Sequence, residues 1–365
     1  MLITAVQLSV QSRRLFHVGA RSAGEPGLTA PLETFRMRCR FPALFLGSVL
    51  LIVAIAHARA QESVNALLWR DPGKVGSRNL YYGPGGKQHQ PLGTVRFIYE
   101  DYQGTSPKFR VRDEDDTKWT VKMGVEAKPE TAAAHLLWAV GYFTDEDYFL
   151  PSLTIEGMPT HLKRGRNLLR PDGMVENVRL KRHLKPEKKI GIWHWKHNPF
   201  TGQQKFNGLR VMMAVMNNWD VKDENNAIYA SDSDSSEEIY LVSDLGASFG
   251  ATGYGWNQAK SKGNLNSYRH SKFISKVTPQ FVDFGCPSRP ALIRFFDIPL
   301  LIHRLRLRWI GKHIPRADAK WMGSLLARLS PDQIRHAFRS AGYSPQEVEG
   351  FSKIVEKRIA ELNQL

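Results

Sequence analysis

The sequence is poor in cysteine and in repeated or low-complexity segments. Its 365 residues include two cysteines, Cys39 and Cys286, so at most one intramolecular disulfide is possible and a zinc site built from cysteines is excluded. We find no internal repeat, and the one low-complexity run, residues 231–238, has the composition of a polar turn. The folded part must therefore be stabilised by an apolar core, for which the chain is long enough.

Acidic residues are few compared with basic ones. The chain has 51 Lys and Arg against 35 Asp and Glu, a formal net charge of +16. A basic surface attracts anionic partners such as phosphate groups, nucleic acid or acidic lipid. Basic stretches lie at residues 161–170, 179–189 and 303–313. Each is simply explained by a solvated helix or strand face, so an anionic surface is kept as a candidate partner and nucleic acid is not favoured.

One long apolar run is present, close to the N-terminus. Residues 37–61, MRCRFPALFLGSVLLIVAIAHARAQ, have two early arginines, an apolar middle and an Ala-x-Ala end. These are the features of a secretory signal peptide. The apolar middle, residues 41–56, is shorter than the about 20 residues that a membrane span needs. The sequence predicts export to a periplasm or the extracellular space, with a signal peptide at about 37–60; anchoring in a membrane by the same segment is the alternative.

Cleavage at that point would remove Cys39 and leave Cys286 alone. An exported chain without disulfides fits a bacterial periplasm better than an extracellular mini-domain. Because a signal peptide normally begins at the N-terminus, Met37 is a candidate translation start. We interpret residues 1–60 as an N-terminal extension and signal peptide, and residues 61–92, rich in Gly, Pro and Lys, as an irregular lead-in.

Residues 93–184 have the pattern of a small sheet with one inserted helix. Alternation of apolar and polar residues predicts strands within the segments 93–101, 108–124 (two strands around an acidic turn), 148–158 and 174–184. Residues 128–143 carry apolar residues at helical spacing, with Pro129 suited to the first helical position and Gly141 to the end. Five strands with a helix after the third are therefore expected.

Residues 185–329 predict a larger, mainly helical part, followed by two helices in residues 330–365. Its recognisable elements are a Trp- and His-rich loop at 190–202, an apolar helix at 208–218 and a hairpin at 226–246. The two final helices have N-cap signals at Ser330 and Ser344, each followed by proline and then by an acid or amide.

Polar residues that suit chemistry gather after the helix at 208–218. The stretch NNWDVKDENN contains Asp220, Lys222 and Asn225 in an Asp-x-Lys-x-x-Asn pattern, with Asn226 as an alternative register for the last position. The next hairpin ends in YLVSDLG, which places Asp244 before a glycine. Carboxylate and amide oxygens are ligands that Mg²⁺ prefers.

A lysine and two acids occur upstream, around the end of the third predicted strand. Lys122 lies in WTVKMG, where apolar neighbours place it on a buried sheet. Glu130 lies in the first turn of the next helix and is positioned to pair with Lys122, with Glu126 as the alternative partner. A buried lysine fixed by an acid is one way to hold phosphate groups.

Taken in chain order, these motifs resemble the protein-kinase superfamily. Asp-x-Lys-x-x-Asn is similar to the kinase catalytic loop, and Asp-Leu-Gly to the metal-binding Asp-Phe-Gly element. The resemblance implies that Asp220 orients or deprotonates the acceptor hydroxyl and that Lys222 neutralises the transferred phosphate. It also implies that Asn225 and Asp244 bind a metal ion. Lys122, fixed by Glu130, would hold the phosphates of the nucleotide.

The resemblance covers about residues 93–250 and departs from ordinary protein kinases at three points. Asn218 and Trp219 replace the usual His-Arg before the catalytic Asp. No clear Gly-x-Gly-x-x-Gly loop flanks the first strands, and no Ala-Pro-Glu follows the Asp-Leu-Gly. The chain is therefore more similar to atypical kinases, which include HipA-like, secretory-pathway and phosphatidylinositol kinases.

The implied fold is α+β with two lobes: residues 93–184 form a small ATP-binding lobe with an antiparallel sheet and one helix, and residues 185–329 a large helical lobe with the catalytic and metal-binding loops. The implied function is an exported kinase that uses ATP with Mg²⁺ or Mn²⁺ and phosphorylates a hydroxyl of an unknown protein, lipid or small molecule. A catalytically inactive kinase-like binding module of the cell envelope is the alternative.

Overall fold

The computed structural model describes the chain from residue 65 to the C-terminus, with gaps. The described ranges are 65–91, 93–104, 106–159, 161–183, 188–218, 220–230, 237–251, 261–285, 305 and 307–365. The predicted N-terminal extension and signal peptide, residues 1–60, lie outside these ranges. No helix within them has both the length and the apolar character that crossing a membrane requires.

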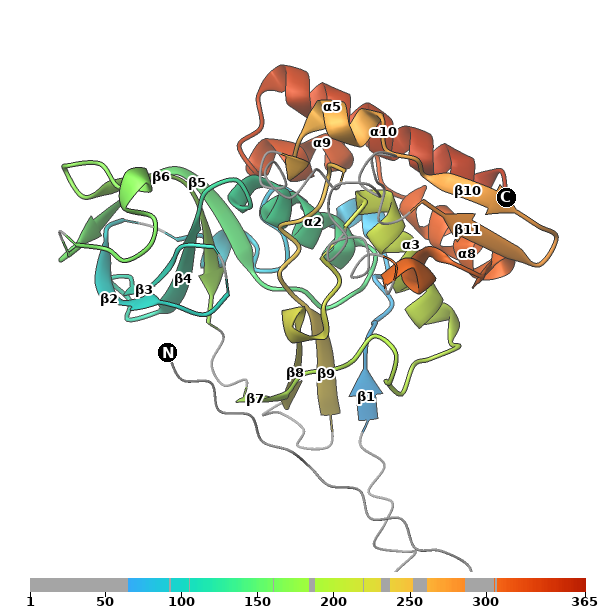
Figure 1. The fold of residues 1–365 in the computed structure, drawn as a ribbon, viewed down its shortest axis with the longest axis horizontal. Helices are drawn as coiled ribbons and strands as arrows, with labels where there is room; N and C mark the ends of the chain where they lie inside the picture. Colours follow the sequence, from blue (N-terminus) through green and yellow to red (C-terminus); the bar gives the residue numbers. More distant parts are fainter. Residues whose placement is uncertain are drawn as a thin grey trace, which may run out of the picture. The chain divides into compact units, whose positions relative to one another are not determined.

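Five strands and one helix form a small lobe, as the alternating sequence pattern predicts. They are β2 (Val95–Asp101), β3 (Lys108–Arg112), β4 (Lys118–Met123), α2 (Ala127–Ala139), β5 (Asp147–Glu156) and β6 (Met174–Arg182). The strands join in the order β2-β3-β4-β6-β5 and close into a barrel, at the left of Figure 1. The predicted antiparallel pairing holds for every pair except β2 and β5, which run parallel where Val95 pairs with Ile155.

The barrel has an apolar core of its own. Successive side chains of a strand point to opposite faces, so alternate residues turn inward. Phe109 and Val111 of β3 and Trp119 and Val121 of β4 are buried in this way. They belong to a cluster of apolar residues that is separate from the core of the helical part. Two cores are the physical basis for describing two lobes within residues 61–365, which form one compact unit.

Helix α2 begins earlier than the sequence suggested. Its first residue is Ala127, so Pro129 occupies the third position and not the predicted first one. Proline is tolerated there because the N–H groups of the first turn have no partner within the helix. The helix ends as predicted just before Gly141, whose φ of 99° is in the region that favours glycine.

A second sheet connects the barrel with the helices. It contains β1 (Asn65–Leu67), β7 (Lys188–Gly191), β8 (Asn226–Ala230) and β9 (Glu237–Val242), in the order β1-β9-β8-β7. The predicted hairpin at 226–246 is the β8–β9 pair. The lead-in is more ordered than expected, because β1 pairs in parallel with β9 and two short 3₁₀ helices, η1 (Val75–Ser77) and η2 (Lys87–His89), follow it.

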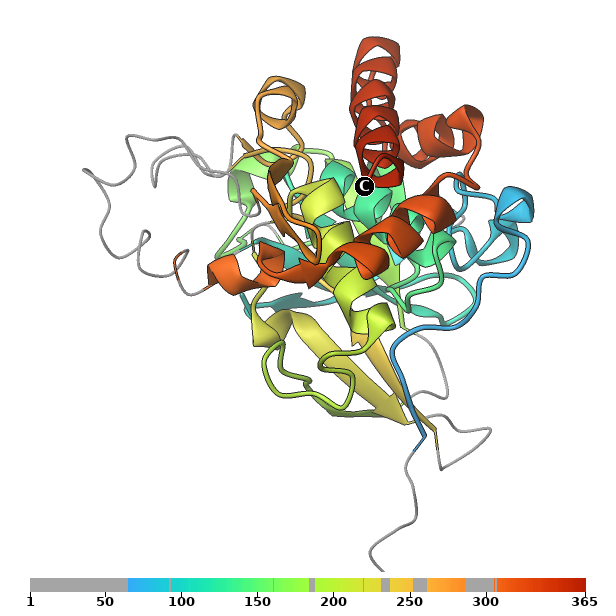
Figure 2. The ribbon, with the colours of Figure 1, turned by 90° about the vertical axis from the view of Figure 1, so that its right-hand side faces the viewer.

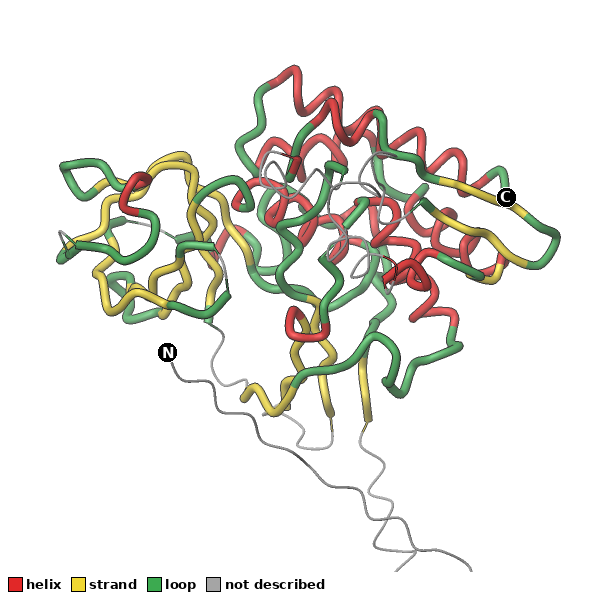
Figure 3. Tube along the Cα trace, in the orientation of Figure 1, coloured by secondary structure: helices red, strands yellow, loops and turns green. Residues whose placement is uncertain are grey.

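The remaining elements form the helical lobe, seen in red at the right of Figure 3. Its helices are α3 (Gln204–Met216), α5 (Leu265–Arg269), α8 (Arg316–Leu326), α9 (Pro331–Ser340) and α10 (Pro345–Asn363). Short 3₁₀ helices occur here and in the barrel: η3 (Arg166–Leu168), η4 (Asp223–Asn225) and η6 (Arg308–Gly311). In Figure 2, α9 and α10 lie at the top and the β8–β9 hairpin at the bottom, with α3 between them.

The last two helices start where the sequence predicted. Ser330 and Ser344 each cap a helix: the serine side chain accepts a bond from the backbone N–H three residues later, at Gln333 and Glu347 respectively. The side chains of Gln333 and Glu347 bond back to the serine N–H, which completes a capping box at both positions.

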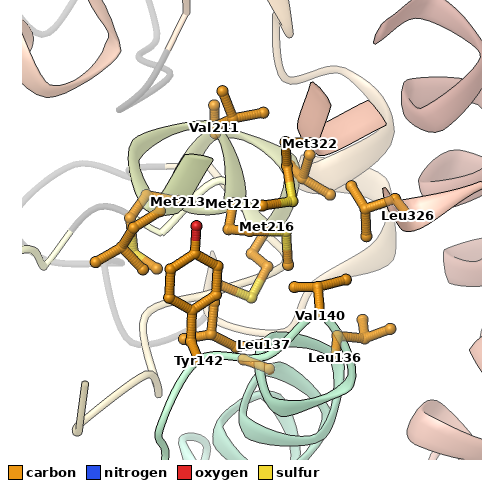
Figure 4. Packing of buried hydrophobic residues seen from close by; sticks show 14 of the residues in the cluster. Leu136, Leu137, Val140, Tyr142, Val211, Met212, Met213, Met216, Met322 and Leu326 are labelled. Atoms are coloured by element: carbon orange, nitrogen blue, oxygen red, sulfur yellow. The ribbon is translucent and has the colours of Figure 1, made fainter. Parts of the chain in front are cut away.

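Helices α2 and α3 meet across the core of the helical lobe. Figure 4 shows Leu137 of α2 and Val140, which follows the end of α2, next to Met212 and Met216 of α3, with Met322 of α8 beside them. These side chains are almost completely buried. Burying each large apolar side chain contributes about 1.5–3 kcal/mol, so this contact fixes α2, and with it the charged residues of its first turn, against the helical lobe.

Two expectations for the second half need correction. A three-stranded sheet, β10 (Ile274–Val277), β11 (Phe281–Phe284) and β12 (Ile314–Pro315), stands where the sequence indicated no strands. The basic stretch 179–189 is not a solvated face throughout, because Arg179 is buried. Arg304 and Arg306 of the third basic stretch lie outside the described residues.

Candidate active site

Lys122 is surrounded by carboxylates in the wall between the two lobes. It lies in the buried part of β4, and its side chain is only 4% exposed. The ammonium nitrogen lies 2.5 Å from a Glu126 oxygen, 2.9 Å from Glu130 and 2.7 Å from Asp244. We call these four residues the Lys122 cluster. The sequence left open whether Glu130 or Glu126 pairs with Lys122, and in the structure both do.

Glu130 is fixed from two sides. One carboxylate oxygen bonds to Lys122, and the other accepts a bond of 2.8 Å from Arg179. Arg179 lies directly opposite Lys122 in the β4–β6 register and also bonds to Asp147 at 3.1 Å. Burying charges is costly unless they are paired and hydrogen-bonded, and this arrangement pairs each of them.

Glu126 connects the cluster to a more distant segment. It lies at the N-terminal boundary of α2, and besides Lys122 it forms an ion pair with Lys262. It also accepts a 2.8 Å bond from the hydroxyl of Ser106, in the β2–β3 connection. One carboxylate therefore holds together β4, the β2–β3 connection and the segment that contains Lys262.

Strand pairing brings Asp244 and Asn225 together. Strands β8 and β9 are antiparallel with Asn226 opposite Val242, and the pairing continues as Ser243 N–H donates to the Asn225 carbonyl. Asp244 follows directly with a φ of 51°, a left-handed conformation that Asp tolerates better than most residues. Its side chain is 45% exposed, so it can meet a ligand as well as Lys122.

The loop from Asp220 to Asn225, called here the Asp220 loop, is held by hydrogen bonds within the loop and by bonds to neighbouring segments. The Asp220 N–H donates to the Asn218 side chain at 3.0 Å, and the Asn225 amide donates to the Asp220 carbonyl at 2.7 Å. Lys222 forms an ion pair with Asp220 at 2.7 Å, with both side chains partly exposed. The structure thus brings Asp220, Lys222 and Asn225 together as the motif predicts.

The neighbouring Asn226 has a different environment. Its side chain is buried and donates to the Trp193 carbonyl at 3.1 Å. The side-chain oxygen of Asn225, in contrast, accepts no hydrogen bond from any residue in the described part of the chain. Between the two registers considered from the sequence, the geometry favours Asn225 as the residue that is available to a metal ion.

A cavity of about 440 Å³ opens between the barrel and the β8–β9 hairpin. Lys122, Glu130, Asn225 and Asp244 are among its lining residues, and the size is in the usual range for small-molecule sites. Asp220 and Lys222 do not line this cavity. They border a small adjoining recess together with Asn225 and Asp244, at the edge of the same space.

Comparisons with known proteins give distant structural likenesses. No protein-family model and no curated protein sequence matches the chain. Among solved structures it is similar to a Helicobacter pylori proinflammatory kinase, CtkA, with 10% identity, a TM-score of 0.43, and coverage of 74% of this chain and 98% of that one. It is also similar to the Golgi casein kinase, with 10% identity, a TM-score of 0.31 and coverage of 92% and 94%.

A third similar structure is the Golgi casein kinase with Mn/ADP bound, with 11% identity, a TM-score of 0.30 and coverage of 74% of this chain and 75% of that chain. At such TM-scores the likenesses assign no activity. The arrangement of this chain itself is a five-stranded small lobe with one helix, a lysine–glutamate pair between them, and an Asp-Leu-Gly after a hairpin. The fold is protein-kinase-like.

Charges in this site stabilise one another. Burial opposes the charge on Lys122, but Glu130, Asp244 and Glu126 outweigh burial and raise the pKa of its ammonium. Burial likewise works to raise the pKa of Glu126 and of Asp244, yet the Lys122 ammonium more than offsets this, and both pKa values are lowered. Lys122, Glu126 and Asp244 are therefore charged together at neutral pH.

The sequence did not predict that each glutamate of the Lys122 cluster has a second cationic partner. These partners are Arg179 for Glu130 and Lys262 for Glu126. Arg179 was interpreted as part of a basic surface, and Lys262 received no role. Alternation along the strand places Arg179 on the face opposite Val178 and Leu180, so the sequence pattern indicated an exposed side chain, whereas both faces are buried here. No local signal identifies Lys262, because its partner Glu126 is distant in the chain.

Proposed function

We propose that this chain is an exported kinase that transfers the γ-phosphate of ATP to a hydroxyl group, with Mg²⁺ or Mn²⁺ as cofactor. The observation that carries the proposal is the position of Lys122: its ammonium is held between Glu130 and Asp244 at the wall of a cavity that Asn225 also lines. A fixed cation beside metal-binding oxygens is what binding of a metal-bound triphosphate requires.

The residues present fit a divalent cation at Asp244 and Asn225. Glu126, Glu130 and Asp244 each offer an oxygen within 4.8 Å of one another, but the Lys122 ammonium is at the centre of these three. A cation is therefore better accommodated on the cavity side of Asp244, together with the side-chain oxygen of Asn225. These are hard oxygen donors of the kind that Mg²⁺ and Mn²⁺ prefer.

Each residue of the site then has a role in transfer. Lys122 contacts the phosphates, and Glu130 keeps the lysine in place. Asp220 orients the acceptor hydroxyl and takes up its proton as the new oxygen–phosphorus bond forms and ADP leaves. Lys222, paired with Asp220 in the structure, neutralises charge on the transferred group. Electrostatic interactions between these groups and the phosphates are stronger where most of the solvent is excluded.

Export is supported by the sequence of residues 37–60, which has the three parts of a signal peptide. The acceptor is proposed to be a hydroxyl of a protein, lipid or small molecule outside the cytoplasm. Mass spectrometry of the mature N-terminus in a cell fraction tests the export step: cleavage near Ala60 is expected, and an intact N-terminus in the cytoplasm would contradict it.

A thermal-shift titration of the full chain with ATP tests the nucleotide site. Metal-dependent stabilisation is expected, by ~2.7 kcal/mol at a hundredfold excess of ligand over its dissociation constant. The Asp244→Asn variant should lose the part that depends on Mg²⁺ or Mn²⁺. Asp115→Asn, in the exposed turn between β3 and β4, is the matched control and should behave like the unmodified protein.

Formation of ADP and of a phosphorylated product then tests transfer. If millimolar ATP gives no shift with either metal, the nucleotide site is wrong. If ATP binds but no ADP forms with any hydroxyl acceptor, the alternative of a kinase-like binding module replaces the enzyme. The kinase-like fold itself stands in both cases, because it rests on the arrangement of the chain.

A further inference from the structure

A second cavity, of about 520 Å³, lies against the first turn of α2. Its walls come from the β4–α2 junction, residues 167–170, the β6 strand, residues 262–263 and the start of α10. It shares no lining residue with the nucleotide cavity. We call it the α2 cavity. None of the roles assigned above uses it.

The hydroxyl of Tyr343 is an unsatisfied buried group in its wall. Tyr343 follows Gly342 in the turn between α9 and α10 and is 7% exposed. Its hydroxyl has no hydrogen-bond partner in the described part of the chain and lies beside Gly263, another wall residue. Burial raises the pKa of this phenol well above its usual value of 10, so it stays protonated and can donate. Buried donors without partners are rare in native proteins and call for an explanation.

A cation without a carboxylate partner reaches the same space. Lys128, in the first turn of α2, lies over the rings of Tyr343 and Phe149, with its nitrogen 5.5 Å and 5.8 Å from the two centroids. Among the described residues it forms no ion pair. The positive end of the α2 dipole adds to its field. A hydroxyl donor and an ammonium thus converge on one wall.

The acidic residues of the wall are already engaged. Glu347 accepts bonds from Ser344 in the capping box, and Glu176 forms an ion pair with Arg170 at 3.2 Å. Apolar surface is provided by Val125, Pro129 and Leu168. The cavity therefore offers hydrogen-bond donors for one negatively charged group and an apolar wall beside them.

We infer that the α2 cavity binds a small ligand with one carboxylate group and an apolar body. The carboxylate accepts a hydrogen bond from the Tyr343 hydroxyl and pairs with the Lys128 ammonium, and the apolar body lies against Val125 and Leu168. The ligand satisfies the one buried donor that the protein leaves unpaired in this wall, which calls for an acceptor and not a cation, and the Lys128 ammonium favours a charged carboxylate over a neutral acceptor.

Such a ligand is also coupled to the nucleotide cavity. Lys262 in its wall forms an ion pair with Glu126, and Glu126 bonds to Lys122. A ligand that shifts the first turn of α2 or Lys262 changes the partners of Lys122. Coupling between two sites is reciprocal, so nucleotide must change the affinity for the carboxylate by the same factor. The coupling rests on the proposed function, whereas the site does not.

Phenylacetate is a suitable probe, with phenylacetamide as its uncharged counterpart. Each is titrated into the full chain while methyl NMR signals of Val125 and Leu168 are recorded. Phenylacetate is expected to give saturable shifts at both methyl positions, and phenylacetamide to bind about tenfold more weakly, since bonds to a charged group are the stronger ones. No saturable shift at 20 mM phenylacetate (roughly the weak limit for a fragment), or equal binding of the amide, would overturn the site.

Variants identify the two donors. Tyr343→Phe and Lys128→Met should each weaken phenylacetate binding, by about tenfold for the lysine, and Tyr99→Phe and Lys320→Met, on exposed surface elsewhere, should not. Tyr343→Phe should also leave the unfolding midpoint of the ligand-free protein unchanged or raised, because no hydrogen bond is lost. A lowered midpoint would mean that the hydroxyl has a structural partner, and the proposal would fail.

The coupling has its own readout. The apparent affinity for phenylacetate is measured with and without saturating ATP and Mg²⁺, and a change that disappears in Glu126→Gln is expected. If ATP does not bind at all, the proposed function fails while the phenylacetate titration still decides the site. If ATP binds and the two affinities are independent, the site stands and the coupling is wrong.

Discussion

The two lysine–carboxylate groups of the site differ in almost every physical respect. Lys122 is 4% exposed and is held by three carboxylates. Lys222 is 45% exposed and is held by Asp220 alone. The first group joins strand β4, helix α2 and the end of the β8–β9 hairpin, whereas the second lies within one loop.

Under the proposed function, this difference suits the two sides of the cavity to different tasks. Charges in a region of low dielectric interact strongly and keep a fixed geometry, which suits a group that positions a nucleotide. A half-exposed ion pair contributes little to stability and can exchange partners. This suits a loop that must receive an acceptor. The two sides therefore respond differently to the same kind of substitution.

Loss of activity is the largest expected effect. Asp244→Asn should abolish metal-dependent nucleotide binding and transfer together. Asp220→Asn should reduce the transfer rate by about 10²–10⁴ and leave nucleotide binding within about twofold, because removal of a general base acts on the chemical step. Turnover and the thermal shift with ATP are measured for both. If Asp220→Asn keeps full turnover, its assigned role is wrong.

Stability should separate the two lysines. Lys122→Met leaves the two buried carboxylates of Glu126 and Glu130, and the half-exposed Asp244, without their shared cation and should lower the free energy of unfolding by about 3–5 kcal/mol. Lys222→Met should change it by less than about 1 kcal/mol. Urea denaturation of both variants checks this. Equal effects would mean that the Lys122 cluster is not desolvated in the way that its burial indicates.

Two adjacent asparagines offer a finer test. Asn226→Ala removes the buried bond to the Trp193 carbonyl and should cost about 1–3 kcal/mol of stability. Asn225→Ala should leave stability within about 0.5 kcal/mol but weaken the metal dependence of ATP binding. If Asn225→Ala lowers stability and Asn226→Ala weakens the metal dependence, then Asn226 is the metal-binding residue.

The smallest effect concerns pH. The pKa of Glu126 is lowered in the folded protein, against the effect of burial, by Lys122 and Lys262. Its contribution to stability is therefore present above the ordinary value of 4.5 and is lost as the pH falls below it. The stability difference between the unmodified protein and Glu126→Gln should be constant from pH 7 to about 5 and shrink towards pH 3. A difference that grows on acidification would contradict the ion pairing.

Local signals in the sequence predicted local structure well. The five strands, the helix after the third and the capped starts of α9 and α10 all occur as expected, because alternation and capping depend on residues within a few positions of one another. The strands of the β10–β11 hairpin escaped prediction because they are only four residues long, too short for a clear alternation.

The sequence by itself determined which chemical groups the site contains and their order: Lys122, Glu130, Asp220, Asn225 and Asp244. Only the tertiary structure decided which of them meet. The pair of Lys122 and Asp244 spans 122 positions, and the second cations, Arg179 and Lys262, join through the β4–β6 register and the segment after Gly246. Such contacts depend on strand register and lobe packing, which single-sequence patterns do not encode, because a side chain's distant partners leave no trace in its own neighbourhood.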